Sequence, residues 1–483
     1  MLKSETVSVR EIGRIREIKG SIVKVDGLAN CMVGQIVNLS GNKKGFVIGF
    51  NETDVLVLLL EAAGKMKAGD RVSSETEAFK IPVGDNFLGR IVNSLCEPMD
   101  GKGKIEENTF SPVFRDAPGV LDRVPVEEML MTGIRIIDAT LPVGKGQRQL
   151  IIGDRMTGKT SIAVDTILNQ RGRHIICIYC CVGRDYASFE KAVTIFKENK
   201  ALDYTIIVSG LAASSIGEQY LAPYAAATLG EYFMDSGRDV FVVFDDLTKH
   251  AWAYRELSLL LERPPGREAY PGDIFYLHAQ LMERAAKLSP KMGNGSMTFF
   301  PIADTLEGDI AGFVPTNLIS MTDGQIYLNS ALFGEGFKPA VDMGLSVSRI
   351  GNRVQSEVLR ELTQDLSLQY IQYRELLKAT KLRAGISESL NKWLAHGEKI
   401  ERILIQENNK PSEIAEQLIL YYALNKGVLD AISDEKCEDF KANILSFARK
   451  NFPSLVNKLD EEKKLTDEDK SRLNECIVMF FKE

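Results

Sequence analysis

The sequence has few cysteines and no long hydrophobic run. Seven cysteines among 483 residues are too few for a disulfide scaffold and predict a reducing, cytosol-like setting. No apolar stretch approaches the roughly 20 residues that a membrane-spanning helix needs. The opening residues, MLKSETVSVREI, lack an apolar core and carry acids early, so we expect neither a secretory signal nor a transit peptide.

An excess of basic residues is also missing. Lysine and arginine total 59 against 66 acidic residues, which gives a net charge of −7. A general nucleic-acid binder would show the opposite balance, so we expect no nucleic-acid partner. Apolar residues make up 45% and charged residues 26%, which is the composition of a folded globular chain rather than a disordered one.

Residues that ligate metals are sparse and scattered. Cys177, Cys180 and Cys181 lie in the apolar run HIICIYCCVG, and no second Cys/His pair follows at zinc spacing. We interpret this run as a buried strand and its cysteines as core packing. The histidines form neither an HExxH motif nor a catalytic order, and we expect structural or solvent-facing roles for His174, His250, His278 and His396.

The chain divides into three parts by pattern. Residues 1–71 contain short β-branched runs punctuated by glycine, which predicts a small β-barrel. Residues 72–355 alternate apolar strands with helices, as in a mostly parallel sheet covered on both faces. Residues 356–483 have helical periodicity and predict an α-helical bundle. The predicted fold class is therefore multidomain α/β.

The strongest motif is GDRMTGKT, residues 153–160, which matches the P-loop pattern GxxxxGK[ST] between a strand and an amphipathic helix. Gly153 and Gly158 let backbone N–H groups curl around phosphate oxygens, and the helix N-terminus adds its positive dipole end. We expect Lys159 to reach the β- and γ-phosphates and Thr160 to offer its hydroxyl to Mg²⁺. The central part is thus predicted to be a RecA-like domain that binds ATP or ADP.

A carboxylate for the metal follows in VFVVFDD, residues 240–246. An apolar strand that ends in an acid is the Walker-B form, and the pattern gains weight when it follows a P-loop. We expect Asp245 to serve Mg²⁺ through a water molecule and Asp246 to be structural.

Several stretches resemble the alpha subunit of the F-type ATP synthase, in order along nearly the whole chain. They are RQLIIGDRMTGKTSIAVDTI, SLLLERPPGREAYPGDIFYLHAQLMERAAKLS, FVPTNLISMTDGQIYL and VDMGLSVSRIGN. The stretch PPGREAYPGD separates this subunit from its catalytic beta relative. The resemblance implies a barrel, a nucleotide-binding core and a helical bundle. It also implies a ring in which three alpha subunits alternate with three beta subunits around a rotating central stalk, the gamma subunit.

The resemblance also assigns residues to the nucleotide, and the chain departs from the family pattern at several of them. Met156 replaces a glutamine, and Lys338-Pro339 replaces Arg-Pro. Gln406 and Asn408 fall where two glutamines usually lie near the adenine. The full expected set is Gly153, Asp154, Arg155, Met156, Thr157, Gly158, Lys159, Thr160, Ser161, Lys338, Pro339, Gln406 and Asn408.

Hydrolysis requires a carboxylate that polarises the attacking water. In the catalytic relatives a glutamate lies just past the strand that follows the P-loop helix, and Arg184 stands at that place here. The alpha family usually has glutamine there. Because arginine cannot accept a proton, we predict that the chain binds MgATP without efficient turnover. The alternative is an independently active P-loop ATPase motor subunit, in which Asp185 or Glu190 positions the water.

Arg349, in the stretch LSVSRIG, is expected to act in another subunit. In the family this arginine reaches across the interface to the γ-phosphate held by the neighbouring beta subunit, as an arginine finger supplied in trans. Ser346 and Ser320 match family positions close to that same partner site.

The resemblance further implies ATP synthesis or hydrolysis coupled to proton or sodium transport. We expect a bacterial protein that associates peripherally with the cytoplasmic face of the cell membrane, through the ion-translocating sector. The β-like pattern begins near residue 7, where the family usually has a helical segment that docks the peripheral stalk. Either the stalk contact differs, or the complex is a specialised rotary ATPase. A purely structural ring member and an RNA motor of related fold are the weaker alternatives.

Overall fold

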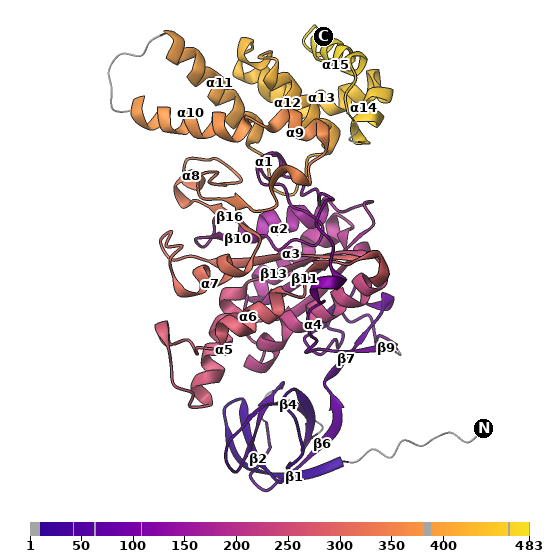
Figure 1. The fold of residues 1–483 in the computed structure, drawn as a ribbon, viewed down its shortest axis with the longest axis vertical. Coiled ribbons are helices and arrows are strands. Elements are labelled where there is room, and N and C mark those ends of the chain that lie inside the picture. The colour runs from indigo at the N-terminus through magenta and orange to yellow at the C-terminus, as the bar shows by residue number, and fades with distance from the viewer. Residues whose placement is uncertain are drawn as a thin grey trace, which may run out of the picture. The chain divides into compact units, whose positions relative to one another are not determined.

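The computed structural model describes residues 10–41, 43–61, 64–107, 109–380, 388–461 and 464–482 (Figure 1). The chain forms two compact units. Unit 1 comprises Met1–Val124, His174–Asp304 and Ala311–Met321, and unit 2 comprises Pro125–Arg173, Thr305–Ile310 and Thr322–Glu483. The predicted fold class is confirmed, since a barrel, a parallel sheet with flanking helices and a helical C-terminal region are all present. The division at residues 71 and 355 stays a prediction, and the start of the β pattern near residue 7 lies outside the described residues.

The first elements of unit 1 form a closed antiparallel barrel. Its strands follow one another in the order β1 (Arg10–Lys19), β2 (Ile22–Asp26), β5 (Val55–Leu59), β4 (Lys43–Phe50), β3 (Gln35–Leu39) and β6 (Arg71–Ala78). Buried valine, isoleucine and leucine side chains fill the interior, which is why these short β-branched runs fold as they do. Gly45 lies where β4 and β5 approach closely, because a Cβ there would come within 2.7 Å of the Leu58 carbonyl oxygen.

A parallel sheet forms the rest of the core of unit 1. Its strands follow the order β15 (Ser296–Asp304), β13 (Asp239–Asp245), β11 (Ile175–Val182), β12 (Thr205–Gly210) and β8 (Ile91–Asn93). The smaller strands are β14 (Ala286–Lys287), paired with β15, and β7 (Lys80–Val83), paired with β9 (Thr109–Pro112). The helices of this unit are α3 (Tyr186–Glu198), α4 (Ile216–Asp235), α5 (Leu247–Leu260), α6 (Ile274–Met282) and α7 (Phe313–Met321). Because the strands are parallel, their carboxyl ends meet at one edge of the sheet.

The cysteines of β11 are packed in the core, as the sequence predicts. Cys177, Cys180 and Cys181 are each 0% exposed, and burial raises the pKa of their thiols. Their apolar surroundings make them inert core residues. Among the described residues, no group of three or more His, Cys, Asp or Glu side chains is placed to hold a metal ion.

Two histidines form a buried series of hydrogen bonds between the helices of unit 1. Nε2 of His250 lies 3.0 Å from the Tyr220 carbonyl oxygen, which can only accept, so this nitrogen carries the proton. Nδ1 of His250 therefore accepts from Nε2 of His278, 3.4 Å away. The amide of Asn317 then donates to Nδ1 of His278 at 3.1 Å. Both rings must be neutral, which fits the expected structural role.

We expect this histidine pair to make unit 1 sensitive to acid. Burial lowers the pKa of His250 to about 4 and that of His278 to about 3, from an ordinary value of 6.5. Below pH 6.5 these two histidines therefore bind protons in the unfolded protein but not in the folded protein. Stability should fall by about 1 kcal/mol per pH unit for each histidine, from pH 6.5 down to about 4 for His250 and about 3 for His278.

The measurement is urea unfolding followed by the fluorescence of Trp252, which lies in α5 with His250, in a Trp393→Phe background. The slope of stability against pH should be smaller in His278→Gln. The matched control is His174→Gln, which changes an exposed histidine. The slope of stability against pH for this variant should equal that of the parent. An unchanged slope in His278→Gln would contradict the neutral-pair assignment.

Unit 2 contains its own strands and the helical region. β10 (Leu150–Gly153) pairs parallel with β16 (Gly324–Leu328), which pairs antiparallel with β17 (Val347–Ser348). The short helices beside them are α1 (Arg135–Thr140), α2 (Lys159–Leu168) and α8 (Ser330–Gly334). The C-terminal helices, orange to yellow in Figure 1, are α9 (Glu357–Thr363), α10 (Leu366–Thr380), α11 (Glu388–Leu404), α12 (Ile414–Asn425), α13 (Asp434–Asn451), α14 (Pro453–Asp460) and α15 (Asp467–Phe480).

The helix α12 is the centre of this region because it is apolar nearly all round. Its residues are almost all buried, and α9, α11, α13, α14 and α15 contact it. Tyr421 and Gln417 fasten it to the neighbourhood of α1: the Tyr421 hydroxyl donates to the Arg135 carbonyl at 2.8 Å, and the Gln417 amide donates to buried Asp138 at 2.9 Å. No helix in the described part of the protein is long and apolar enough to span a membrane.

Candidate functional site

The predicted P-loop forms the connection between β10 and α2 in unit 2. Gly153 ends the strand, and a Cβ there would lie 2.5 Å from the Leu328 carbonyl oxygen, so only glycine fits. Gly158 has a φ of +99° and stands at the N-cap of α2, which points the first amides of the helix toward the loop. Met156 also has a positive φ, 64°, and its side chain is 90% exposed. Its thioether therefore lies off the backbone cradle.

Hydrogen bonds within the loop, and from Thr305 and Gly308, hold the base of the loop. The ammonium of Lys159 donates to the carbonyl oxygens of Gly153 and Asp154, at 2.8 and 2.5 Å. Oδ1 of Asp154 accepts from the Thr305 hydroxyl at 2.6 Å and the Gly308 amide at 2.8 Å. Burial raises the pKa of Asp154, but these hydrogen bonds outweigh burial and the pKa is lowered overall. Asp154 is thus a charged anchor that fixes the loop.

The residues expected near the adenine lie on two segments of unit 2, one at Lys338-Pro339 and one at residues 406–408. The Gln406 backbone amide donates to the Lys338 carbonyl at 2.8 Å, which brings these two predicted positions together. The Gln406 side chain is buried and fully used, because it accepts from the Arg135 amide and donates to the Gly133 and Lys410 carbonyls. Lys338 and Asn408 are exposed, so their side chains are the accessible ones of this set.

Asp165, which sequence reasoning missed, links the P-loop helix to the second of these segments. Its carboxylate on α2 accepts from the Asn409 backbone amide at 2.7 Å. Asn409 has a φ of +60°, so the segment turns sharply at this point. Burial raises the pKa of Asp165 to about 7, against this hydrogen bond. No local pattern marked this residue, because its partner lies 244 positions away.

In unit 1, the predicted Walker-B acid lies at the carboxyl end of β13 and is completely buried. Oδ2 of Asp245 accepts from the Tyr179 hydroxyl at 2.8 Å. Asp246 is also 0% exposed and caps α5, accepting from the Lys249 amide at 2.8 Å, which fits its expected structural role. Burial, together with the charges of Asp304 and Asp245, raises the pKa of Asp246 to about 7. Asp304 was missed, although it ends an apolar strand just as Asp245 does.

Arg184 lies against both of these acids. Its Nε is 3.8 Å from Oδ1 of Asp245, and its NH1 is 3.9 Å from Oδ2 of Asp246. Gly183 makes this placement possible: its φ is +60°, and a Cβ there would lie 2.6 Å from Cβ of Lys249. Burial lowers the pKa of Arg184, but the charges of Asp245 and Asp246 outweigh burial and the pKa is raised. The guanidinium therefore stays charged.

Asp185, the acid nearest to Arg184 in sequence, is committed to a helix cap. Its two oxygens accept from the backbone amide and the hydroxyl of Ser188, each at 2.8 Å. These hydrogen bonds lower the pKa of Asp185. A carboxylate with a lowered pKa and both oxygens engaged is a poor general base.

The oxygen donors predicted for Mg²⁺ are of the kind that this ion prefers. Thr160 offers a hydroxyl at the start of α2, and Asp245 offers a carboxylate. The Asp245 oxygens already face Tyr179 and Arg184, so a contact with the ion through water suits this acid better than direct ligation. Each of the two residues, taken by itself, therefore offers an oxygen of the kind that suits the ion.

Arg349, Ser346 and Ser320 were predicted to serve a partner site. Arg349 is exposed, and its backbone amide donates to the Asp323 carbonyl at 2.8 Å. Ser346 is buried, and its hydroxyl accepts from the Tyr327 amide at 2.9 Å. Ser320, on α7 in unit 1, is exposed and donates to the Asn317 carbonyl at 2.7 Å. Arg349 and Ser320 are exposed and Ser346 is buried, and the hydroxyl groups of both serines form hydrogen bonds within the protein.

Two family models match this protein. One, the nucleotide-binding domain of the ATP synthase alpha/beta family, matches residues 133–348, and the other, the C-terminal domain of that family's alpha and beta subunits, matches residues 355–480. The protein is 44% identical to ATP synthase subunit alpha of Petrotoga mobilis over 480 residues, which cover 99% of this sequence and 95% of that one. It is 46% identical to the same subunit of Clostridium botulinum strain Eklund 17B over 473 residues, with coverage of 97% and 93%. A further relative, from Sulfurovum, is 43% identical over 474 residues, with coverage of 98% and 94%.

Proposed function

Because this protein belongs to the ATP synthase alpha/beta family and its relatives are alpha subunits, we propose that it is the nucleotide-binding, non-catalytic subunit of a rotary F-type ATP synthase or ATPase. The single observation that carries the non-catalytic role is Arg184. It lies against Asp245 and Asp246 at the place where a catalytic subunit needs a carboxylate. Asp185, the nearest substitute, is occupied as a helix cap.

The proposed ligand is MgATP or MgADP, held at the P-loop. Amides of residues 153–161 would cradle the phosphates, and Lys159 would turn its ammonium from the loop carbonyls to the β- and γ-phosphates. Mg²⁺, when bound, would offset phosphate charge, with Thr160 as a direct ligand and Asp245 acting through water. Lys338-Pro339 and Asn408 would line the base, and Gln406 would hold that segment in place.

We propose that the protein acts as part of a complex with other subunits. Arg349 would reach the γ-phosphate of a neighbouring beta subunit, with Ser346 and Ser320 near that interface. The ring would turn the gamma subunit, and the complex would couple ATP synthesis or hydrolysis to proton or sodium transport at the cytoplasmic face of a bacterial membrane. The exposed guanidinium of Arg349 supports this role, because it is presented away from the protein's own core.

The decisive test is ATP binding and steady-state ATP hydrolysis by the purified full-length protein with Mg²⁺. We expect binding without turnover above a Lys159→Ala blank. Lys159→Ala should weaken ATP binding roughly 10- to 100-fold, because it removes a charge-assisted contact to the phosphates. Lys191→Ala, at an exposed lysine of α3, is the matched control and should bind normally. Turnover that disappears in Lys159→Ala would overturn the non-catalytic role and favour an independently active ATPase.

A further inference from the structure

The helix α2 of unit 2 is bonded to both parts of the proposed nucleotide site that lie in this unit. Its N-cap is Gly158, at the end of the P-loop, and its first residue is Lys159. Asp165 lies six residues further along the same helix, a rise of about 9 Å. The Asp165 carboxylate accepts from the Asn409 backbone amide at 2.7 Å, and Asn409 directly follows Asn408. One helix thus begins at the phosphate loop and, farther along, holds the turn of Asn408 and Asn409, here called the base-side turn.

The base-side turn has exposed side chains and an uncommon backbone conformation. The φ of Asn409 is +60°, in the left-handed region, which is unfavourable for a residue other than glycine. The Gln406 side chain spans the turn by donating to the Lys410 carbonyl at 2.8 Å, and Asp165 holds the Asn409 amide itself. The Asn408 side chain, next to Asn409, is therefore presented from an anchored backbone.

The place of Asp165 on α2 has a cost that packing alone does not explain. Ile162 and Leu168, three residues before and after it, are buried and apolar, and Asp165 is itself only 6% exposed. A carboxylate in such surroundings is unfavourable unless a polar group compensates it. The Asn409 amide is such a group, so the hydrogen bond is what the carboxylate contributes at this position.

We propose that Asp165 is a positioning residue of the nucleotide site, which sets the place of the Asn408 side chain beside the base by holding the Asn409 amide. The inference rests on the proposed function, since it takes a nucleotide to be held at the P-loop with Asn408 near the adenine. Asp165 acts through the base-side turn and not on the nucleotide itself. Without its carboxylate, the turn spends less time in the arrangement that binds the base, and the apparent affinity falls by that fraction.

The test is a double-variant cycle on the full-length protein, with MgATP binding measured by titration calorimetry. Asp165→Ala should weaken ATP binding roughly 10-fold, the effect of losing one hydrogen bond to a charged acceptor. Asn408→Ala should weaken it by a similar factor. The variant with both changes should bind little more weakly than either single one, because both changes remove the same contact to the base. If Asp165 supported the structure in general, the two losses would instead multiply to roughly 100-fold.

Two further variants separate the hydrogen bond from the charge and from stability. Asp165→Asn keeps an oxygen that accepts from the Asn409 amide, so it should bind ATP within about 3-fold of the parent. The matched control is Asp469→Ala, which removes another buried carboxylate of unit 2, on α15, that accepts from the Thr466 amide at 3.2 Å. This control should bind ATP as the parent does, even where it lowers stability. Asp165→Leu, which has a similar shape and no acceptor, replaces the alanine variant in the cycle if that variant does not fold.

The outcomes distinguish this inference from the proposed function. Losses that multiply, an Asp165→Ala protein that binds ATP as the parent does, an Asn408→Ala protein without loss, or an Asp165→Asn protein as weak as Asp165→Ala would each overturn the inference alone. A parent protein that binds no MgATP would overturn the proposed function as well.

Discussion

Replacing Arg349 with alanine is expected to lower the ATPase rate of the assembled alpha–beta complex by roughly 10³- to 10⁵-fold, the value of an arginine finger. The physical reason is charge. A guanidinium that reaches the γ-phosphate stabilises negative charge that develops in the transition state, and alanine supplies none. Among the described residues, the Arg349 side chain makes no hydrogen bond or ion pair within its own subunit, so little else should be lost.

The local structure holds Arg349 ready for this role. Its backbone amide is fixed by the Asp323 carbonyl, and the Asp323 carboxylate is itself held by two hydrogen bonds from the Arg148 guanidinium, at 3.0 and 2.7 Å. The backbone is therefore anchored at this position, while the side chain is exposed. An anchored backbone limits the region that the guanidinium can reach, so less conformational freedom is lost when it meets a phosphate.

The measurement is steady-state ATP hydrolysis by the complex reconstituted with parent or variant subunits, together with ATP binding by the isolated subunit. Arg349→Ala should bind ATP as the parent does. Arg353→Ala, at an exposed arginine four residues away, is the matched control and should leave the rate within a few-fold. Near-normal hydrolysis by complexes with Arg349→Ala would remove the proposed trans role.

Local pattern predicted most of the fold because each signal lies within a short window. The apolar run around Cys177 predicted β11, all of which is buried. The glycine and lysine spacing of the P-loop predicted a strand-to-helix turn, and Gly158 indeed begins α2 with a positive φ. The motif VFVVFDD predicted an apolar strand that ends in an acid, and β13 indeed ends at Asp245.

Pairings between distant residues could not be predicted in the same way. Gln406 was assigned to the adenine by resemblance, yet its amide is used by groups 271 and 273 positions away. Asp165 holds the Asn409 amide across a similar separation. Such contacts depend on the tertiary fold, and no composition or spacing rule in one segment encodes the partner. For the same reason, the sequence predicted roles for Asp245 and Asp246 but none for Asp304, which ends the neighbouring strand.

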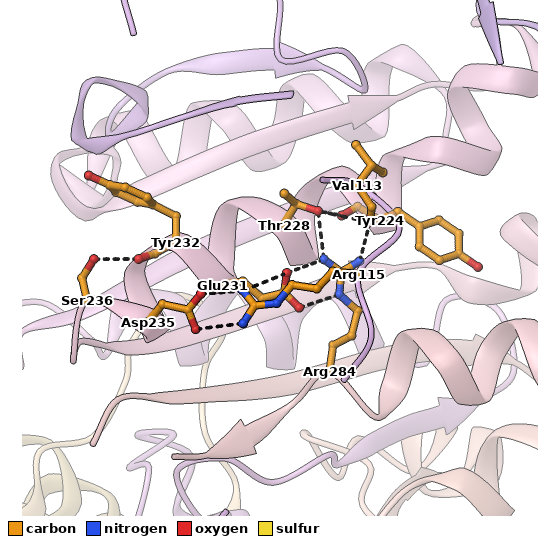
Figure 2. A network of polar contacts seen from close by, with 9 residues as sticks. All are labelled: Val113, Arg115, Tyr224, Thr228, Glu231, Tyr232, Asp235, Ser236 and Arg284. Atoms are coloured by element: carbon orange, nitrogen blue, oxygen red, sulfur yellow. Dashed lines mark hydrogen bonds and ion pairs between the residues drawn. The ribbon is translucent and has the colours of Figure 1, made fainter. Parts of the chain in front are cut away.

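The buried pair of Arg284 and Glu231 is another contact of this kind, and it carries the largest expected effect on stability (Figure 2). The Arg284 guanidinium donates to both Glu231 oxygens, at 2.7 and 2.6 Å, and the side chains are only 1% and 2% exposed. Further bonds reach the Val113 carbonyl at 3.0 Å and the Thr228 hydroxyl at 2.9 Å. The network thus fastens the segment at Val113 to α4.

Arg284→Met should therefore lower the free energy of unfolding by about 3–5 kcal/mol, because it leaves the Glu231 charge buried without its main partner. Urea unfolding followed by Trp252 fluorescence measures this loss. The control is Arg238→Met, which breaks an ion pair with Asp85 of similar length, 2.5 Å, but with side chains 41% and 51% exposed. That change should cost less than about 1 kcal/mol, since water already screens the exposed pair.

The double variant Arg284→Met/Glu231→Leu separates the cost of an unpaired charge from the value of the pair. If the penalty comes from the stranded carboxylate, removing that carboxylate should recover most of the stability lost in Arg284→Met. If the pair itself supplies the stability, the double variant should stay as unstable as the single one. We expect recovery, because a buried ion pair gains little over apolar packing of similar volume. In the single variant Glu231 keeps, among the described residues, only the partly exposed guanidinium of Arg115, at 4.0 Å, which compensates the buried charge less well.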